Sequence, residues 1–230
     1  MTDNLKDVYN RIALGWYNRR HWTIFRLELE ALAQEWSQGK LLNLGCGHGA
    51  DFLPFTQNFE LYGIDFADEM LRLARKYAAK FNFTVNLTVA DICYLPYADA
   101  TFDYIIAVAA YHHLKQAQQL HAFWELERVL KPGGVAFITV WNRFQPRFWC
   151  KGKEVQVPWQ IKDETLYRYY YLFTYRELKQ LAAAAGLEIC KVFPESGYRF
   201  PITLFSQNIC LLVKKKKRGK GWNKCKIMLY

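Results

Sequence analysis

The sequence predicts an α/β fold in which a doubly wound, mainly parallel seven-stranded sheet has helices on both faces. Two observations predict it. Short apolar runs alternate with stretches in which apolar residues recur at helical spacing, and strands separated by helices form mainly parallel sheets. In addition, the first run ends in a glycine-spaced turn at Gly45, Gly47 and Gly49, and the second ends at Asp65. This pattern is typical of α/β sheets that bind a nucleoside-bearing ligand.

The expected elements follow one another in a regular order. Two helices, over residues 5–17 and 22–36, precede the sheet, because Leu5, Val8, Ile12 and Trp16 recur at helical spacing and the second stretch has a similar apolar face. Strands are expected near residues 40–44, 60–64, 84–89, 104–109 and 135–141, with a closing pair near 187–193 and 207–213. Helices are expected near residues 50–56, 67–81, 116–130 and 175–185.

The length of 230 residues indicates one domain, which we expect to span residues 1–213. Residues 1–38 would form a helical cap. The regular pattern fails over residues 142–173, where aromatic side chains alternate with cations. A long loop without regular structure is often a lid or binding element, so we expect a substrate-side insertion here. Its aromatic and basic side chains suit single-stranded nucleic acid, although they could instead plug one end of the sheet.

Charge and cysteine content narrow the class of protein further. The net charge is +10, and eight of the lysines and arginines lie in a basic tail over residues 214–230, so the rest carries about +2. The tail could be a solvated extension, or an arm that binds phosphates, or a segment that is attracted to an anionic membrane surface. The six scattered cysteines indicate reduced thiols in a cytoplasmic protein and no metal site. We expect neither a signal peptide nor a transmembrane segment.

The glycine-spaced turn leaves two classes of ligand open. Gly45-x-Gly47-x-x-Ala50 suits a dinucleotide, and Gly45-x-Gly47-x-Gly49 suits S-adenosylmethionine equally well. Asp65 can accept hydrogen bonds from both ribose hydroxyls of either ligand. The alternative interpretation is that Asp65 is an exposed residue at the start of a helix, without a role in ligand binding.

Later motifs distinguish the two ligands. Asp91 and Ile92 follow the third strand, where the carboxylate could accept from an adenine amino group and Ile92 could pack on the ring. Small residues around Ala107, at the end of the fourth strand, would leave room for a sulfonium. The run from Lys131 to Gly134 ends a helix and turns into the fifth strand, since Pro and Gly-Gly do not continue a helix.

Together these motifs resemble class I S-adenosylmethionine-dependent methyltransferases, which have a Rossmann-like fold. The resemblance covers residues 40–141 and includes Phe102-Asp103 and the Lys-Pro-Gly-Gly run, which a NAD dehydrogenase would not be expected to have. One departure is Asn43, where the family usually has an aspartate. The resemblance implies the cofactor S-adenosyl-L-methionine and the following binding residues: Gly45, Cys46, Gly47, Gly49, Asp65, Phe66, Met70, Asp91, Ile92 and Ala107.

A narrower resemblance joins the flanks to the tRNA wobble-uridine carboxymethyl methyltransferases, which esterify 5-carboxymethyluridine in the anticodon loop. The similar segments are residues 8–13 with Arg20, then Trp141, residues 157–159, 168–173 and 207–208. Asn10 stands for the family's Asp, Tyr171 stands for its His, and the Trp-Pro after the arginine is absent. The resemblance implies tRNA or another RNA as substrate and a small zinc-ribbon activator subunit as partner, with any zinc held by that subunit.

An ester-forming reaction would need no general base, because a carboxylate nucleophile with a pKa of about 4 is already ionised. Arg20 and His113 are nevertheless the catalytic candidates, although His112 and His113 could simply line or pack the site. Arg20 and Arg168 could pair with a substrate carboxylate or phosphate. The expected substrate-binding residues are Arg20, Trp159, Arg168, Tyr169 and Tyr170.

Two other functions remain open from the sequence. One is a small-molecule or lipid-quinone methyltransferase of the same fold, since fold does not fix function. The other is a non-catalytic RNA- or partner-binding module that lost cofactor affinity through Asn43.

Overall fold

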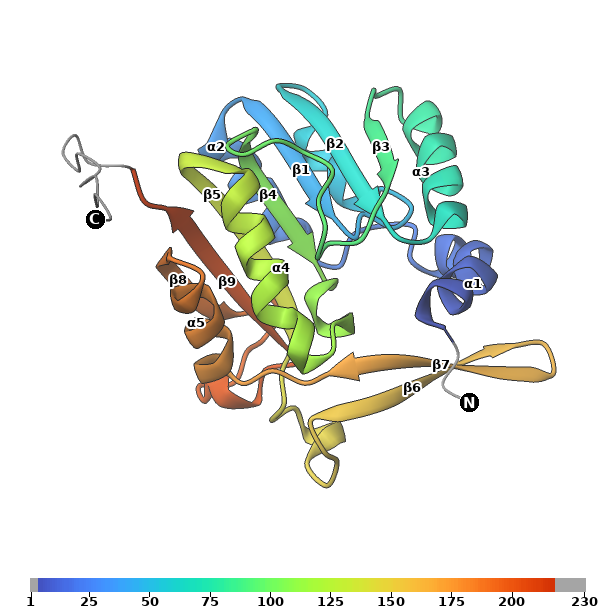
Figure 1. Cartoon of the computed structure of the whole chain (residues 1–230). Helices are drawn as coiled ribbons and strands as arrows, with labels where there is room; N and C mark the ends of the chain where they lie inside the picture. The colour runs from blue at the N-terminus through green and yellow to red at the C-terminus, as the bar shows by residue number, and fades with distance from the viewer. Residues whose placement is uncertain (1–3, 218–230) are drawn as a thin grey trace, which may run out of the picture.

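The computed structural model describes residues 4–217, and within them a seven-stranded sheet forms the centre of the molecule (Figure 1). The spatial order of its strands is β3-β2-β1-β4-β5-β9-β8. The first five are parallel, whereas β9 runs antiparallel to both β5 and β8. The bounds are β1 Gly39–Leu44, β2 Phe59–Asp65, β3 Asn86–Val89, β4 Phe102–Val108, β5 Leu130–Trp141, β8 Leu187–Pro194 and β9 Asn208–Lys215. The expected α/β class and doubly wound, mainly parallel sheet are confirmed.

Helices cover both faces of this sheet because its central strands are apolar on both sides. In β1, for example, Leu42 packs into the core beside Phe123 and Leu126 of α4, whereas its neighbour Leu41 packs on the opposite face with Leu29 of α2. Consecutive strand residues point to opposite faces. On one side lie α4 (Gln116–Val129) and α5 (Tyr175–Ala184), seen in front of the sheet in Figure 1. On the other lie α2 (Arg26–Trp36), the 3₁₀ helix η1 (Ala50–Phe55) and α3 (Asp68–Lys80).

The segment over residues 142–173 is not the irregular loop that we expected from the sequence. Most of it forms a β-hairpin of β6 (Glu154–Ile161) and β7 (Glu164–Tyr171), paired along its whole length. The alternation of apolar and polar residues that marks a strand is hidden in β7 because Tyr169, Tyr170 and Tyr171 follow one another. The turn places Lys162 at a φ of 47°, without the glycine that usually signals such a turn.

The hairpin packs against the first helix, α1 (Leu5–Arg19), and crosses below the carboxyl ends of the parallel strands (Figure 1). An ion pair joins Arg11 of α1 to Glu164 of β7, and the rings of Trp16 and Trp159 lie 5.5 Å apart. The two flanking segments of the sequence therefore meet in space at one edge of the sheet.

Smaller differences from the sequence-based expectation concern the ends of elements. Helix α2 begins at Arg26, which leaves residues 22–25 as a joint, and the expected helix over residues 50–56 is a 3₁₀ helix that contains Pro54. The Lys-Pro-Gly-Gly run lies inside β5. Strand β9 extends to Lys215, so the expected tail begins in the sheet; its residues 218–230 lie outside the described part of the chain. Within residues 4–217, no helix is long and apolar enough to cross a membrane.

We predict that Gly63→Ala destabilises the fold. A Cβ at Gly63 would approach Phe52 to 2.8 Å, Cys46 to 2.9 Å and Leu87 to 3.0 Å. Overpacking of this kind lowers the free energy of unfolding by about 1–3 kcal/mol. Thermal or urea unfolding would measure it. Gly197→Ala is the matched control, because a Cβ there meets nothing within 4 Å, and we expect a change below about 0.5 kcal/mol. Equal stability of the two variants would contradict the packing argument.

Candidate active site

A cavity of about 1010 Å³ opens at the carboxyl edge of β1, β2 and β4. In open α/β sheets, ligands bind in the crevice outside the carboxyl ends of the strands. The walls come from the glycine turn after β1, the ends of β2 and β4, the loop after β3, α1 with the joint to α2, and the β6–β7 hairpin. The cavity therefore has a sheet side and a hairpin side.

The glycine turn on the sheet side is fixed to the end of β2 by Asp65. One carboxylate oxygen of Asp65 accepts from the backbone N–H of Gly47 at 2.9 Å, and the other accepts from that of Ala67 at 2.9 Å. Gly45 has a φ of 69°, and a Cβ there would approach the Cβ of Ala110 to 2.7 Å. A side chain at Gly45 would therefore clash, and the turn stays open to a ligand.

Burial raises the pKa of Asp65 to about 6. Backbone hydrogen bonds from Ala67, Gly47 and Phe66 act in the opposite direction and limit this rise. The carboxylate is therefore mostly ionised at neutral pH. Each carboxylate oxygen has more than one lone pair, so both can still accept from ribose hydroxyls.

The loop after β3 brings Asp91 and Ile92 to the same cavity. One oxygen of Asp91 accepts from the backbone N–H of Cys93 at 2.8 Å, which shapes the turn. The Cys93 thiol is a further hydrogen-bond partner of this carboxylate. Because a carboxylate has about four lone-pair sites, it can still accept from an adenine amino group.

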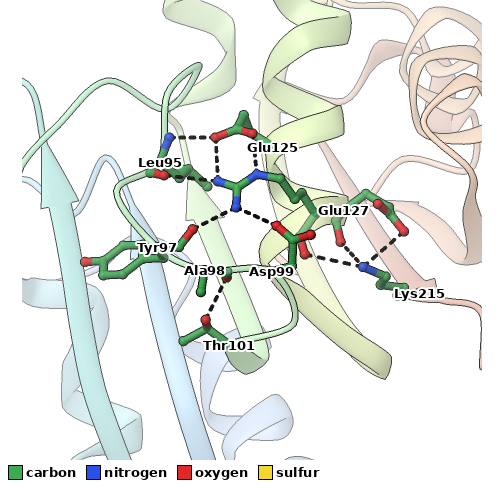
Figure 2. Close-up of polar contacts among 9 residues, drawn as sticks. Leu95, Tyr97, Ala98, Asp99, Thr101, Glu125, Glu127 and Lys215 are labelled. Atoms are coloured by element: carbon green, nitrogen blue, oxygen red, sulfur yellow. Dashed lines mark hydrogen bonds and ion pairs between the residues drawn. The ribbon is translucent and has the colours of Figure 1, made fainter.

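The continuation of this loop is held on α4 by the guanidinium of Arg128, whose partners Leu95, Tyr97, Asp99 and Glu125 are labelled in Figure 2. It donates to the carbonyls of Leu95 at 3.0 Å and Tyr97 at 2.7 Å, and to the carboxylates of Glu125 at 2.6 Å and Asp99 at 2.9 Å. Glu125 in turn accepts from the backbone N–H of Leu95 at 2.7 Å. The helix thereby fixes the loop that presents the adenine-side residues.

The structure places most of the sequence-predicted cofactor residues on the cavity wall. Eight of the ten line it: Gly45, Cys46, Gly47, Asp65, Phe66, Met70, Asp91 and Ile92. Gly49 and Ala107 do not line it. A Cβ on Gly49 would face Phe52 and Ala74, so this glycine serves the turn at a φ of 90°. Ala107 is fully buried within β4, and the residues that reach the cavity are the three that follow it, Val108 to Ala110.

All five expected substrate residues line the cavity, and they gather on the hairpin side. Arg168 of β7 is only 6% exposed. Its guanidinium lies 5.0 Å from the ring of Trp159, 5.6 Å from Trp16 and 5.4 Å from Tyr170, and it donates to the Tyr170 hydroxyl at 3.0 Å. No acidic side chain of residues 4–217 forms an ion pair with Arg168, and its Nε has no hydrogen-bond partner there.

Two other arginines on the hairpin side of the cavity also form no ion pair with an acidic side chain of the described residues. Arg20 is exposed, lies 5.5 Å from the ring of Trp16, and forms no ion pair within the described residues. Arg147 lies 4.9 Å from the ring of Trp141. The hairpin side of the cavity is therefore cationic and aromatic, whereas the sheet side carries the carboxylates of Asp51, Asp65 and Asp91.

Both ring nitrogens of His113 form hydrogen bonds within the protein. Nδ1 donates to the carbonyl of Tyr169 at 2.9 Å, since a carbonyl only accepts, and Nε2 therefore accepts from the Tyr9 hydroxyl at 2.7 Å. Burial, together with the charge of Arg168 and against the hydrogen bond to the Tyr169 carbonyl, lowers the pKa of His113 to about 4. His112 is stacked on Tyr170 at 4.7 Å, and burial holds its pKa well below the usual value. Both rings are neutral at physiological pH.

Several cavity residues were missed by the sequence analysis. Trp16 was noted only as part of a helix face, and Arg147 only as one cation of the segment now seen to precede the hairpin. His48 lies within the glycine turn and Asp51 lies two residues after Gly49. Nothing in the sequence indicates that their side chains face the cavity. Only the folding of α1 and the hairpin over the sheet edge brings these residues together.

The wall as a whole fits an adenosyl ligand with a charged tail. Asp65 and Asp91 have free acceptor capacity at the ends of neighbouring strands, and the apolar side chains of Phe66, Met70 and Ile92 lie beside them. Asn43, the departure from the family pattern, is fully buried, and neither its amide nitrogen nor its oxygen has a partner. It does not enter the cavity wall.

Comparison with known proteins finds similarity to methyltransferases. Residues 41–134 match the family of methyltransferase domains. A tRNA (carboxymethyluridine(34)-5-O)-methyltransferase of Schizosaccharomyces pombe is 26% identical over 220 residues, which cover 84% of this chain and 90% of that protein. A probable tRNA methyltransferase 9B of Homo sapiens is 33% identical over 128 residues, but these span 55% of this chain and only 27% of the human protein.

The solved structures include an S-adenosylmethionine-dependent methyltransferase from Clostridium acetobutylicum with a TM-score of 0.71. The match covers 91% of this chain and 99% of that one, at 15% identity. At this identity the similarity shows a shared fold.

We predict that Arg128→Met weakens binding of S-adenosylhomocysteine about three- to tenfold, because the loop that carries Asp91 loses its anchor on α4. We also expect it to lower the free energy of unfolding by about 1–2 kcal/mol, a modest value since the guanidinium is partly solvated. Isothermal titration calorimetry and thermal unfolding measure the two effects. Arg72→Met is the control: Arg72 pairs with Glu69 on the surface, and neither quantity should change beyond about 0.5 kcal/mol.

The raised pKa of Asp65 predicts opposite pH effects on binding and on stability. Protonation removes acceptors, so the affinity for 5′-methylthioadenosine, which has the ribose but no amino acid, should fall about tenfold from pH 7 to pH 5. The unliganded fold instead gains stability as the pH falls through 6, since its carboxyl binds the proton more tightly than the unfolded chain, with its pKa of 3.8. Asp65→Asn should flatten the binding profile and reduce the slope of the stability profile, to which Asp51 still contributes because burial also raises its pKa to about 6. Unchanged slopes would contradict the assignment.

Proposed function

We propose that this protein, an S-adenosylmethionine-dependent methyltransferase of class I, methylates the carboxylate of a carboxymethyl-modified wobble uridine in tRNA. The cofactor, when bound on the sheet side of the cavity, supplies an electrophilic methyl group on a sulfonium. The proposal rests mainly on one observation, the buried and unpaired guanidinium of Arg168 on the hairpin side.

A buried cation without an acidic partner is costly, and the effective penalty reaches several kcal/mol. The rings of Trp16, Trp159 and Tyr170 offset part of it through cation–π contacts. They do not supply a negative charge. An anionic acceptor would, and a carboxylate matches the planar fork of a guanidinium. Arg168 thus favours an acceptor that carries a carboxylate.

The aromatic side chains next to Arg168 support a nucleobase as the rest of the acceptor. Trp159 of β6 and Trp16 of α1 are partly exposed and both line the cavity. Exposed rings of this kind stack on unpaired bases, and sequence-specific recognition of RNA mostly uses bases splayed out of loops. A wobble uridine is such a base.

The chemistry of the site also suits a carboxylate nucleophile. The two candidate proton acceptors, His112 and His113, are neutral, and Nε2 of His113 is occupied by the Tyr9 hydroxyl. With a pKa of about 4, His113 is a weak base for removing a proton from an alcohol. We assign it a positioning role: it fixes Tyr9 and the backbone of Tyr169. A carboxylate is ionised without help, so the residues need only align it with the methyl group.

Other parts of the chain take supporting roles in this proposal. Residues 1–213 act as one methyltransferase domain, in which the cap over residues 1–38 and the insertion over 142–173 enclose the acceptor. Arg20 and Arg147 would contact phosphates or the carboxylate, and the basic segment from Lys214 would bind the tRNA backbone. A substrate of this kind would place the protein in the cytoplasm. By analogy with related tRNA enzymes, a small zinc-ribbon subunit would act as the activating partner.

The test uses labelled S-adenosylmethionine, the full chain with and without a zinc-ribbon activator, and three acceptors: tRNA with 5-carboxymethyluridine, tRNA without it, and a panel of small acids. We expect label only in the first, as an ester that mild alkali releases as volatile methanol. Turnover of small acids without tRNA would favour a small-molecule methyltransferase. Cofactor binding without any turnover would contradict the proposal, and no binding at all would favour a non-catalytic module.

We predict that Arg168→Met lowers kcat/KM for the modified tRNA about ten- to hundredfold, because it removes a charge-assisted contact with the acceptor. The affinity for S-adenosylhomocysteine should stay within twofold. Arg176→Met, an exposed arginine of α5, is the matched control and should keep wild-type turnover. A loss of cofactor affinity equal to the loss of turnover would show that Arg168 does not act on the acceptor.

A further inference from the structure

Four exposed cations lie where the end of α1 meets α3: Arg19, Arg20, Lys76 and Lys80. None of them forms an ion pair with an acidic side chain of residues 4–217. The acids of α3, Asp68 and Glu69, lie in its first turn and pair with other cations. The positive charge of this region therefore has no acidic partner within the described chain.

Arg19 and Arg20 are neighbours of Arg168, because they contact the same two rings. The guanidinium of Arg19 lies 4.9 Å from the ring of Trp159, and that of Arg168 lies 5.0 Å from the same ring. Arg20 lies 5.5 Å from the ring of Trp16, and Arg168 lies 5.6 Å from it. The cations at the end of α1 therefore continue the cationic hairpin side of the cavity.

Contacts between the α1–α2 joint and α3 extend the row of cations further. The ammonium of Lys80 donates to Nε2 of His21 at 3.1 Å, since an ammonium only donates. The Tyr77 hydroxyl donates to the carbonyl of His21 at 2.8 Å, which fixes the joint on α3. The ammonium of Lys76 lies 5.9 Å from the ring of Tyr17. Lys76 and Lys80 are four residues apart and share one face of the helix.

An exposed aromatic ring lies in the middle of this row. Trp22 follows His21 in the joint, lines the cavity and is 61% exposed. Its ring contacts are both edge-to-face, with His21 at 5.1 Å and Phe81 at 5.6 Å. No ring of the described residues is therefore stacked on Trp22. An exposed ring among unpaired cations suits a single nucleic-acid strand, whose bases stack on rings and whose phosphates contact cations.

We propose that these residues bind the RNA strand next to the acceptor nucleotide. The base of an adjacent nucleotide stacks on Trp22, and its phosphates contact the cations on both sides of that ring. We call this surface the basic rim, and it consists of Arg19, Arg20, Trp22, Lys76 and Lys80. The inference rests on the proposed function, because the basic rim is continuous with the acceptor side of the cavity. It separates two roles: Arg168 selects the carboxylate, and the basic rim supplies affinity for the strand.

The experiment measures binding by fluorescence anisotropy over a series of salt concentrations. The probe is a labelled anticodon stem-loop with an unmodified wobble uridine, so binding is measured without methyl transfer. Each phosphate contact on a single strand contributes about 0.7 to the slope of log K against log salt. The double variant Lys76→Met with Lys80→Met should therefore reduce the slope by about 1.4 and weaken binding about tenfold at 0.1 M salt.

Trp22→Ala separates stacking from charge. It should weaken binding about five- to hundredfold, the range for loss of one stacked base, and leave the salt slope unchanged. Arg176→Met with Lys179→Met is the matched control, because it removes two exposed cations from α5 and should change neither quantity. The affinity of both lysine-containing double variants for S-adenosylhomocysteine should stay within twofold, which shows that they are folded.

The proposal would be overturned if wild-type protein did not bind the stem-loop, if neither rim variant lost affinity, or if the α5 control lost as much. Polyphosphate and phosphatidylserine vesicles are the competitors without bases. Equal competition by either, together with no effect of Trp22→Ala, would assign the basic rim to anions in general and overturn the proposal too. Binding that depends on the basic rim, without methylation of the modified tRNA, would contradict only the proposed reaction.

Discussion

The carboxylate of Asp65 is the contact on which the site depends. It accepts hydrogen bonds from the backbone of Gly47 and Ala67, and so holds the turn after β1 against the end of β2. The two strands are parallel neighbours, hence their carboxyl ends lie at one edge and a single short side chain can join them. The same group remains able to accept from a ribose. Burial raises its pKa to about 6, so the site combines structural and ligand-binding demands in one acid.

The cavity beside this turn has negative side chains on its sheet side and positive side chains on its hairpin side. The sheet side carries three carboxylates, whereas Arg20, Arg147 and Arg168 line the cavity from α1, the segment before the hairpin, and β7. Such a division orients a cationic sulfonium donor toward the sheet and an anionic acceptor toward the hairpin. The neutral state of His113 agrees with it, because an acceptor that is already ionised requires alignment and charge neutralisation rather than proton removal.

Much of the fold and of the cofactor side follows from local sequence. The seven strands of the central sheet and α3, α4 and α5 lie near the expected positions because their apolar residues repeat with the period of one element. Eight of the ten expected cofactor residues line the cavity. Ala107 lies within β4, paired with Ile138 of β5, one residue before the first residue of that strand that lines the cavity. The hairpin was missed because the consecutive aromatic residues Tyr169, Tyr170 and Tyr171 conceal the alternation of a strand in β7.

The sequence by itself determined the strands of the sheet, the glycine turn and the acids at the end of β2 and after β3, because each depends on residues close together in the chain. Only the tertiary structure decided what faces the acceptor. Trp16 and Trp159 are far apart in sequence, yet their rings lie 5.5 Å apart, and the isolation of Arg168 from every acid of the described chain depends on which elements surround it. Contacts between distant segments arise from packing, so no local pattern encodes them.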